Sequence, residues 1–151
     1  MEQYIKIQRI PYEEPYHLNL VVEASNGVTH GKLEYYCNAS DLHDIGKRLK
    51  NFPKNFPNNS SDEYIYSLGS EKEEDRFAFY IHFKFYTIDS VGNCAVQLKI
   101  NNNEKSPDEN RCTFSINTKV ADINRLGDLF IGFSKLKHSE LIWKITSGEL
   151  R

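Results

Sequence analysis

Alternation of apolar and polar residues is the clearest signal in the chain, and it is strongest in the second half. In the segment RFAFYIHFKFYTID, which begins at Arg76, every second position is apolar over more than ten residues. A period of two over this length predicts a strand of an antiparallel sheet with one packed face. The packed face is expected to carry Phe77, Phe79, Ile81, Phe83 and Phe85, and the other face Ala78, Tyr80, His82, Lys84 and Tyr86.

Shorter alternating segments predict further strands on both sides of this one. Turn signals such as SNG and SVGN separate them, and a long polar loop runs from Asn101 to Asn110. Together they predict an antiparallel sheet of six or seven strands. The segments are YIKIQRI, HLNLVVEA, GKLEYYC, EYIYSLG, CAVQLKI and CTFSINT, and LIWKIT is expected to form a short last strand or a packed tail.

Two segments have the period of an amphipathic helix instead, DLHDIGKRLKNF and DINRLGDLFIGF, and each holds a glycine in its middle. Glycine inside a helix costs about 0.5–1 kcal/mol relative to alanine. We therefore expect Gly46 and Gly127 to let each helix approach the bulky side chains of the sheet. The leading aspartates, Asp41 and Asp122, are expected to cap the helices; a catalytic pair of carboxylates is the alternative.

The two helical segments align without a gap, from Asp41 with Asp122 to Phe52 with Phe133. We therefore predict one α+β domain over residues 1–151, with both helices on one face of the sheet. The alignment also predicts an internal duplication of strands followed by a helix, with units of about 1–53 and 62–136. The alternative is chance, since any two amphipathic helices share an apolar pattern.

Charge and cysteine usage narrow the classes of partner and compartment. The net charge is −2 and the pI is near 6.2, which lacks the basic footprint of a nucleic-acid binder, so nucleic acid is not expected as a partner. No apolar run reaches membrane-spanning length, and the N-terminal segment lacks the apolar core of a signal peptide. The three cysteines follow no CxxC spacing, which favours reduced thiols in the cytoplasm.

Motifs for catalysis, metal binding or phosphate binding are missing from the sequence. The five histidines are scattered, no serine lies in a G-x-S-x-G elbow, and no glycine-rich phosphate loop is present. We therefore expect no enzyme, no metal and no cofactor. His82 could act as a general base only if a carboxylate approached it in space; an exposed histidine on a strand is the alternative.

The outward face of the long strand is the candidate binding surface. Tyrosine is large, rigid and able to form hydrogen bonds, so it suits protein recognition, although an ordinary solvent-facing sheet surface would look the same. The acidic connection before the strand is expected to steer a basic partner. The predicted partner-binding residues are Tyr80, His82, Lys84 and Tyr86 on the strand, with Glu71, Glu73, Glu74 and Asp75 in the connection.

The segment GNCAVQLKINNN, between the aromatic strand and a strand–helix unit, resembles segments of small bacterial proteins. Some of those proteins are encoded beside toxins and act as immunity proteins. The resemblance implies a cytoplasmic, non-enzymatic protein that binds one toxin domain and blocks it by occlusion. The alternative is a small enzyme or small-molecule-binding protein with a site between the sheet and the helices.

Overall fold

The computed structural model describes residues 2–54, 61–72 and 78–151, and within these ranges it contains nine strands and two helices. This composition confirms the predicted α+β class. The elements are β1 (Gln3–Glu13), β2 (His17–Asn26), β3 (His30–Cys37), α1 (Ala39–Lys50), β4 (Glu63–Gly69), β5 (Tyr80–Thr87), β6 (Asn93–Asn101), β7 (Arg111–Lys119), α2 (Val120–Phe133), β8 (Glu140–Lys144) and β9 (Ser147–Leu150).

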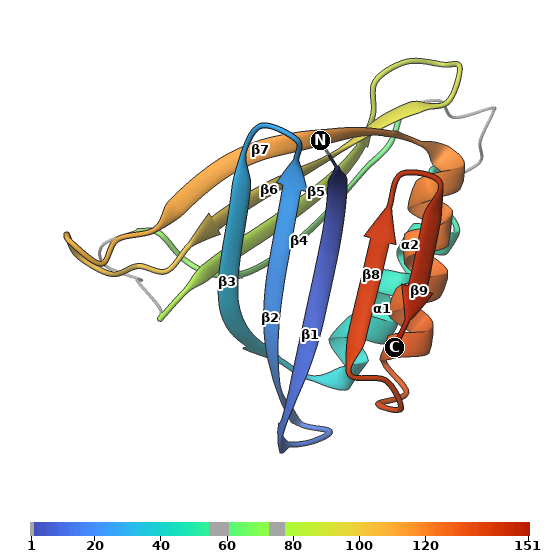
Figure 1. The fold of residues 1–151 in the computed structure, drawn as a ribbon. Helices are drawn as coiled ribbons and strands as arrows, with labels where there is room; N and C mark the ends of the chain where they lie inside the picture. The colour runs from blue at the N-terminus through green and yellow to red at the C-terminus, as the bar shows by residue number, and fades with distance from the viewer. Residues whose placement is uncertain (1, 55–60, 73–77) are drawn as a thin grey trace.

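The strands of the described ranges form two antiparallel sheets, whereas the sequence predicted one. Sheet A has the order β3-β2-β1-β8-β9, and sheet B has the order β4-β5-β6-β7. Sheet B crosses behind sheet A, and the two helices lie toward one side of the molecule (Figure 1). The strand count rose because the C-terminal hairpin of β8 and β9 pairs with β1 and completes sheet A.

The apolar side chains of both sheets meet in one core, as the alternation predicted. In β5, Ile81, Phe83 and Phe85 are at most 3% exposed, and the residues between them are half-buried. Phe77, which was assigned to the same face, lies outside the described residues. The core also holds Trp143 of β8, whose indole N–H donates to the main-chain oxygen of Asp122 at 2.8 Å.

The two helices touch through their central glycines. A Cβ atom on Gly46 would lie 2.8 Å from the carbonyl oxygen of Gly127 and 2.8 Å from the backbone nitrogen of Ile131. A Cβ atom on Gly127 would lie 2.7 Å from the carbonyl oxygen of Gly46 and 2.5 Å from the backbone nitrogen of Lys50. The glycines therefore serve close packing, but against the other helix and not against the aromatic side chains of the sheet.

Helix α1 is tied to sheet B, whereas α2 packs on sheet A and is also bonded to sheet B at its start, so the expectation that both helices lie on one face of a single sheet is corrected. In α1, Asp41 accepts a hydrogen bond from the hydroxyl of Tyr66 in β4 at 3.1 Å. The cap of this helix is Asn38, whose side chain accepts from the backbone N–H of Asp41 at 3.0 Å. Helix α2 packs on sheet A, where a Cβ atom on Gly148 would lie 2.6 Å from a methyl group of Leu129.

Asp122, which is 4% exposed, joins the start of α2 to the β8–β9 turn. One carboxylate oxygen accepts from the hydroxyl of Thr118 at 2.7 Å, and the other from Arg125 at 2.9 Å and from the backbone N–H of Thr146 at 3.0 Å. Burial alone would raise the pKa of Asp122, but these hydrogen bonds together hold that pKa below its ordinary value. Its role is therefore structural, and it does not form a pair with Asp41.

Neither helix is long and apolar enough to cross a membrane. Each of them follows a group of antiparallel strands in the chain, β1 to β3 before α1 and β4 to β7 before α2. The single domain with an internal duplication stays a prediction.

Exchange of either central glycine for alanine should lower the free energy of unfolding. Alanine normally favours a helix, but here its methyl group overlaps backbone atoms of the facing helix, which side-chain rotation cannot relieve. We expect Gly46→Ala and Gly127→Ala each to cost about 1–3 kcal/mol by overpacking. The measurement is urea unfolding followed by circular dichroism. Gly132→Ala is the matched control, because the nearest atom there is the flexible tip of Leu150; equal losses in all three variants would contradict the helix–helix explanation.

Asp122→Asn should destabilise the protein at neutral pH by about 1–3 kcal/mol, because it weakens hydrogen bonds to a buried carboxylate. A carboxyl group with a lowered folded-state pKa stabilises the protein above its unfolded pKa, and this contribution disappears as pH falls through the folded pKa. The difference in free energy of unfolding between wild type and variant should therefore be largest at pH 7 and shrink below about pH 4. Unfolding curves at several pH values measure it, with the exposed Asp128→Asn as control. A difference that grows toward low pH would refute this role.

Candidate functional site

The outer face of sheet B is an open surface formed by alternate residues of four strands. The strand register places these residues in rows across the sheet, and none of the helices covers them. Three of the rows combine aromatic or basic residues of the central strands with small polar residues of β7. The rows are Glu63–Tyr86–Ala95–Asn117, Ile65–Lys84–Gln97–Ser115, Ser67–His82–Lys99–Thr113 and Gly69–Tyr80–Asn101–Arg111.

The aromatic side chains of this face follow one strand, β5. The hydroxyl of Tyr80 lies 3.3 Å from Nδ1 of His82, and the centroids of the two rings are 6.2 Å apart. Two residues further on, the Nζ atom of Lys84 lies 5.1 Å from the centroid of the Tyr86 ring. Beside Tyr86 in the register stands Ala95, which is 1% exposed although it belongs to the outer face. The rings therefore line a strip with a lysine among them.

The charges of this face are predominantly basic. Lys84 and Lys99 stand on the two central strands, and Arg111 and Lys119 stand at the two ends of β7. Glu63 at the β4 edge is the acidic residue of the four rows, and its carboxylate lies 3.4 Å from Nζ of Lys84. Lys99 has no carboxylate within ion-pair distance in the described part of the chain. This face therefore offers positive charge to an anionic partner.

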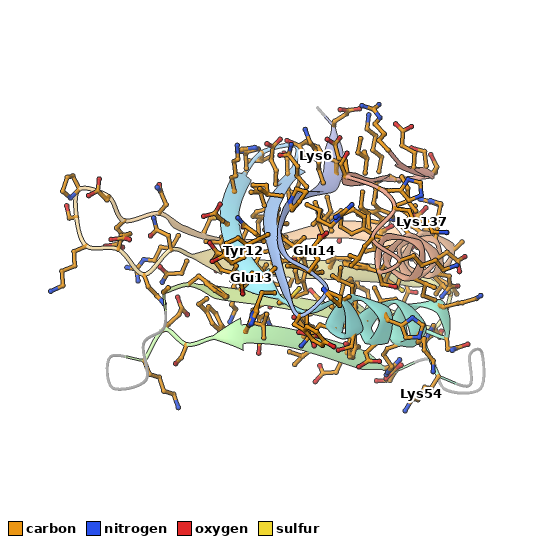
Figure 2. All side chains as sticks on the ribbon, turned by 90° about the horizontal axis from the view of Figure 1, so that it is seen from below. Lys6, Tyr12, Glu13, Glu14, Lys54 and Lys137 are labelled. Atoms are coloured by element: carbon orange, nitrogen blue, oxygen red, sulfur yellow. The ribbon has the colours of Figure 1, made fainter. Side chains whose placement is uncertain are left out.

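The outer face of sheet A differs, because its charges are balanced. Its acidic residues are held by neighbours: the hydroxyl of Tyr4 donates to Glu23 at 2.7 Å, and Arg151 pairs with Glu149 at 2.7 Å. Lys6, which is labelled in Figure 2, belongs to this face. The charged residues there are Lys6, Lys32, Lys144 and Arg151 with Glu23, Glu34, Glu140 and Glu149.

The surroundings of His82 keep its imidazole neutral. Partial burial lowers the pKa of His82, and the positive charges of Lys99 and Lys84 lower it further, while Glu71 opposes them. A neutral ring next to two lysines adds no repulsion against them and presents an aromatic surface. Burial also raises the pKa of Tyr80, with a further contribution from the charge of Glu71, so its phenol stays protonated.

The structure brings together half of the predicted site residues. Tyr80, His82, Lys84 and Tyr86 share one face as expected. Glu71 lies at the margin of that face, where it accepts a hydrogen bond from the side chain of Asn101 at 2.8 Å, so it does not extend freely toward a partner. Glu73, Glu74 and Asp75 lie outside the described residues.

The sequence reasoning missed the basic residues that other strands add to this face. The inward positions of CAVQLKI were recognised, and the same alternation places Gln97 and Lys99 outward. In β7 it places Arg111 and Lys119 outward as well. What the sequence could not show is that these strands are neighbours of β5, because this depends on the strand order and register.

The space between the sheets and the helices is filled mainly with apolar side chains in the described part of the chain. The largest fully buried side chains, among them Trp143, Phe130 and Phe133, occupy it. The described residues include no group of three or more His, Cys, Asp and Glu side chains arranged for a metal ion.

Comparison with known proteins gives two solved structures with a similar course of the chain, while no protein-family model and no curated protein matches. One is the plant transcriptional regulator PBF-2, with 9% identity, a TM-score of 0.47, and coverage of 89% of this chain and 76% of that chain. The other is WHY3 from Arabidopsis thaliana, with 11% identity, a TM-score of 0.42, and coverage of 89% and 82%.

Two expectations from the sequence are corrected here. The prediction of a toxin-neutralising immunity protein is wrong, because the similar structures are a plant transcriptional regulator and WHY3, and not immunity proteins. The prediction that the partner is a toxin domain and not nucleic acid is contradicted as well. The sequence argument used the net charge of the whole chain, and a net charge of −2 does not show that Lys84, Lys99 and Arg111 stand on one face of sheet B.

The pKa of His82 should be measurably low and should respond to its neighbour on β6. We expect the imidazole to titrate below 6.5 in proton NMR, the ordinary value for histidine. Lys99→Gln should raise this pKa, because the substitution removes a positive charge that disfavours the imidazolium. A His82 pKa that is unchanged in the variant would show that the two side chains do not interact across the strands.

Proposed function

We propose that the chain binds single-stranded nucleic acid on the outer face of sheet B. The observation that carries this proposal is the combination of half-buried aromatic rings and basic residues on one sheet face, where Lys84, Lys99 and Arg111 stand on adjacent strands and Glu63 is the acidic residue of the four rows. Aromatic side chains for base stacking, within a positively charged surface for the backbone, are the two elements that single-strand binding requires.

The strip along β5 provides the stacking surface. Alternate residues of a β-strand are about 6.7 Å apart. Successive unstacked bases of a nucleic acid that runs along β5 can therefore contact the side chains of Tyr80, His82, Lys84 and Tyr86. Stacking of one base on an aromatic side chain contributes about 1–3 kcal/mol. The neutral state of His82 supports this use of its ring.

Lys84, Lys99 and Arg111 provide the contacts to phosphate. They stand on three adjacent strands, β5, β6 and β7, and so follow a diagonal across the face. Between them lie the amide of Gln97 and the hydroxyl of Thr113, which can donate to base edges and accept from them. Along this diagonal, groups that can contact phosphates therefore alternate with groups that can contact bases.

The shape of the face favours a single strand over a duplex. Duplex bases are read by a helix or a two-stranded ribbon that enters the major groove, and the outer face of sheet B carries neither. Aromatic side chains that lie flat on a sheet reach only unstacked bases, as in proteins that bind single-stranded RNA on a sheet.

A reducing compartment such as the cytoplasm suits this proposal. The three cysteines, Cys37, Cys94 and Cys112, are free thiols, and burial raises the pKa of each one. Protonated, partly buried thiols are slow to form disulfides.

Fluorescence anisotropy with labelled dT12 and rU12 is the direct test. We expect binding to both or to one of them, with weak competition by a duplex of equal length. If three basic residues contact phosphates, log Kd should change with log salt with a slope of about 2, which is roughly a 20-fold weakening between 50 and 200 mM salt. Lys84→Gln and Lys99→Gln should each weaken binding and lower the slope, and Tyr86→Ala should weaken binding with the slope unchanged.

Lys6→Gln is the matched control, because Lys6 also stands on a strand but belongs to the balanced face of sheet A. It should bind like the wild type. Absence of oligonucleotide binding at 50 mM salt, or equal losses in the Lys6 and Lys84 variants, would rule out the outer face of sheet B as the binding site.

A further inference from the structure

The edge strands of the two sheets, β3 and β7, meet at a contact that depends on one glycine. A Cβ atom on Gly31 would lie 2.6 Å from Sγ of Cys112 and 3.3 Å from the terminal methyl of Ile100. Glycine therefore lets β3 approach sheet B more closely than any other residue would. Near this contact, the side-chain amide of Asn26 donates to the carbonyl oxygen of Ser115 in β7 at 3.2 Å, which fixes the two sheet edges relative to each other.

A cavity of about 280 Å³ opens beside this contact. Its floor is apolar and consists of Gly31, Ile100 and Cys112, and its rim carries His30, Lys32 and Arg111. The volume is at the lower end of the range of small-molecule pockets, roughly 300–1,000 Å³. The cavity therefore suits one small group and not an extended ligand.

The basic groups on the rim of the cavity keep open hydrogen-bond donors beside their acidic neighbours. Nε of Arg111 lies 3.0 Å from Glu109, but this contact leaves the terminal nitrogens of the guanidinium group open. His30 lies 3.6 Å from Glu23, which also accepts from Tyr4. Lys32 has no carboxylate within ion-pair distance among the residues that the structure describes.

Arg111 links this cavity to the face described above. It ends the row Gly69–Tyr80–Asn101–Arg111 of sheet B, and like Lys32 of sheet A it also lines the cavity. A nucleic-acid strand that crosses the outer face of sheet B and continues past Arg111 would therefore reach the cavity.

From this geometry, we propose that the cavity between β3 and β7 is a phosphate-binding site, held by Lys32 and Arg111 with His30 as a further donor. Planar guanidinium and ammonium groups at the mouth of a shallow pocket are suited to a phosphate oxygen. The phosphate group can belong to the bound strand or to a free ligand such as inorganic phosphate. The first source rests on the proposed function, and the second does not.

The experiment has two arms, both on the full chain. In the first, dT12 affinity is measured for wild type, Lys32→Gln, Lys32→Arg and Lys6→Gln. Lys6 is the matched control because it stands in the same row of sheet A as Lys32, two strands away from the cavity. In the second arm, inorganic phosphate is added and the amide signals of Gly31 and Cys112 are followed by NMR.

If the strand supplies the phosphate, Lys32→Gln should weaken dT12 binding about 3- to 10-fold and reduce the salt slope by about 0.7. Lys32→Arg should restore both, and Lys6→Gln should leave both unchanged. If dT12 does not bind at all, the proposed function fails. A shift of Gly31 and Cys112 by phosphate that is lost in Lys32→Gln would then still establish the site for a free phosphate group.

Two results would overturn the site. One is dT12 binding that depends on Lys84 but is equal in the Lys32 and Lys6 variants, together with no phosphate-induced shift. The other is absence of both dT12 binding and phosphate-induced shifts.

Discussion

The contact between Gly46 and Gly127 is the constraint on which the arrangement of the molecule depends. Helix α1 is bound to β4 of sheet B through Asp41 and Tyr66, and α2 is bound to both the C-terminal hairpin of sheet A and β7 of sheet B through Asp122. The helix pair therefore connects elements of both sheets on one side of the core. With side chains at the two glycines, backbone atoms of the facing helices would overlap and the helices would have to separate. Backbone contact between helices is what allows two small sheets to share one core.

The distribution of charge follows from the same arrangement. Because the apolar faces of both sheets are turned inward, most ionised strand residues lie on the two outer faces. On sheet A, acidic and basic residues alternate across the rows, as in Lys32–Glu23–Lys6. On sheet B the corresponding row reads Ser67–His82–Lys99–Thr113, with hydroxyls where sheet A has carboxylates. The binding character of sheet B therefore results as much from missing acids as from added bases.

Local features of the fold could be read from the sequence, whereas features that depend on strand order could not. Alternation placed Phe83 inside and Lys84 outside correctly, since it needs only the period of one strand. Strand β9, Ser147–Leu150, gave no signal, because SGEL does not alternate and is held by pairing with β8. The partner of each helix glycine depends on tertiary packing. For the candidate site, the β5 residues were found, but Lys99 and Arg111 join them only through the register.

The position of β7 at the edge of sheet B has a consequence for solubility. An unpaired strand edge is a template for pairing with other chains, and proteins protect such edges with charge and with local capping. Here Arg111 and Lys119 stand at the two ends of the strand. Near its middle, the carbonyl oxygen of Ser115 accepts a hydrogen bond from the side chain of Asn26. The basic residues of β7 thus keep copies of the chain apart as well as attracting an anion. Removal of both would expose an uncharged edge that can recruit further strands, so loss of ligand and self-association would occur together.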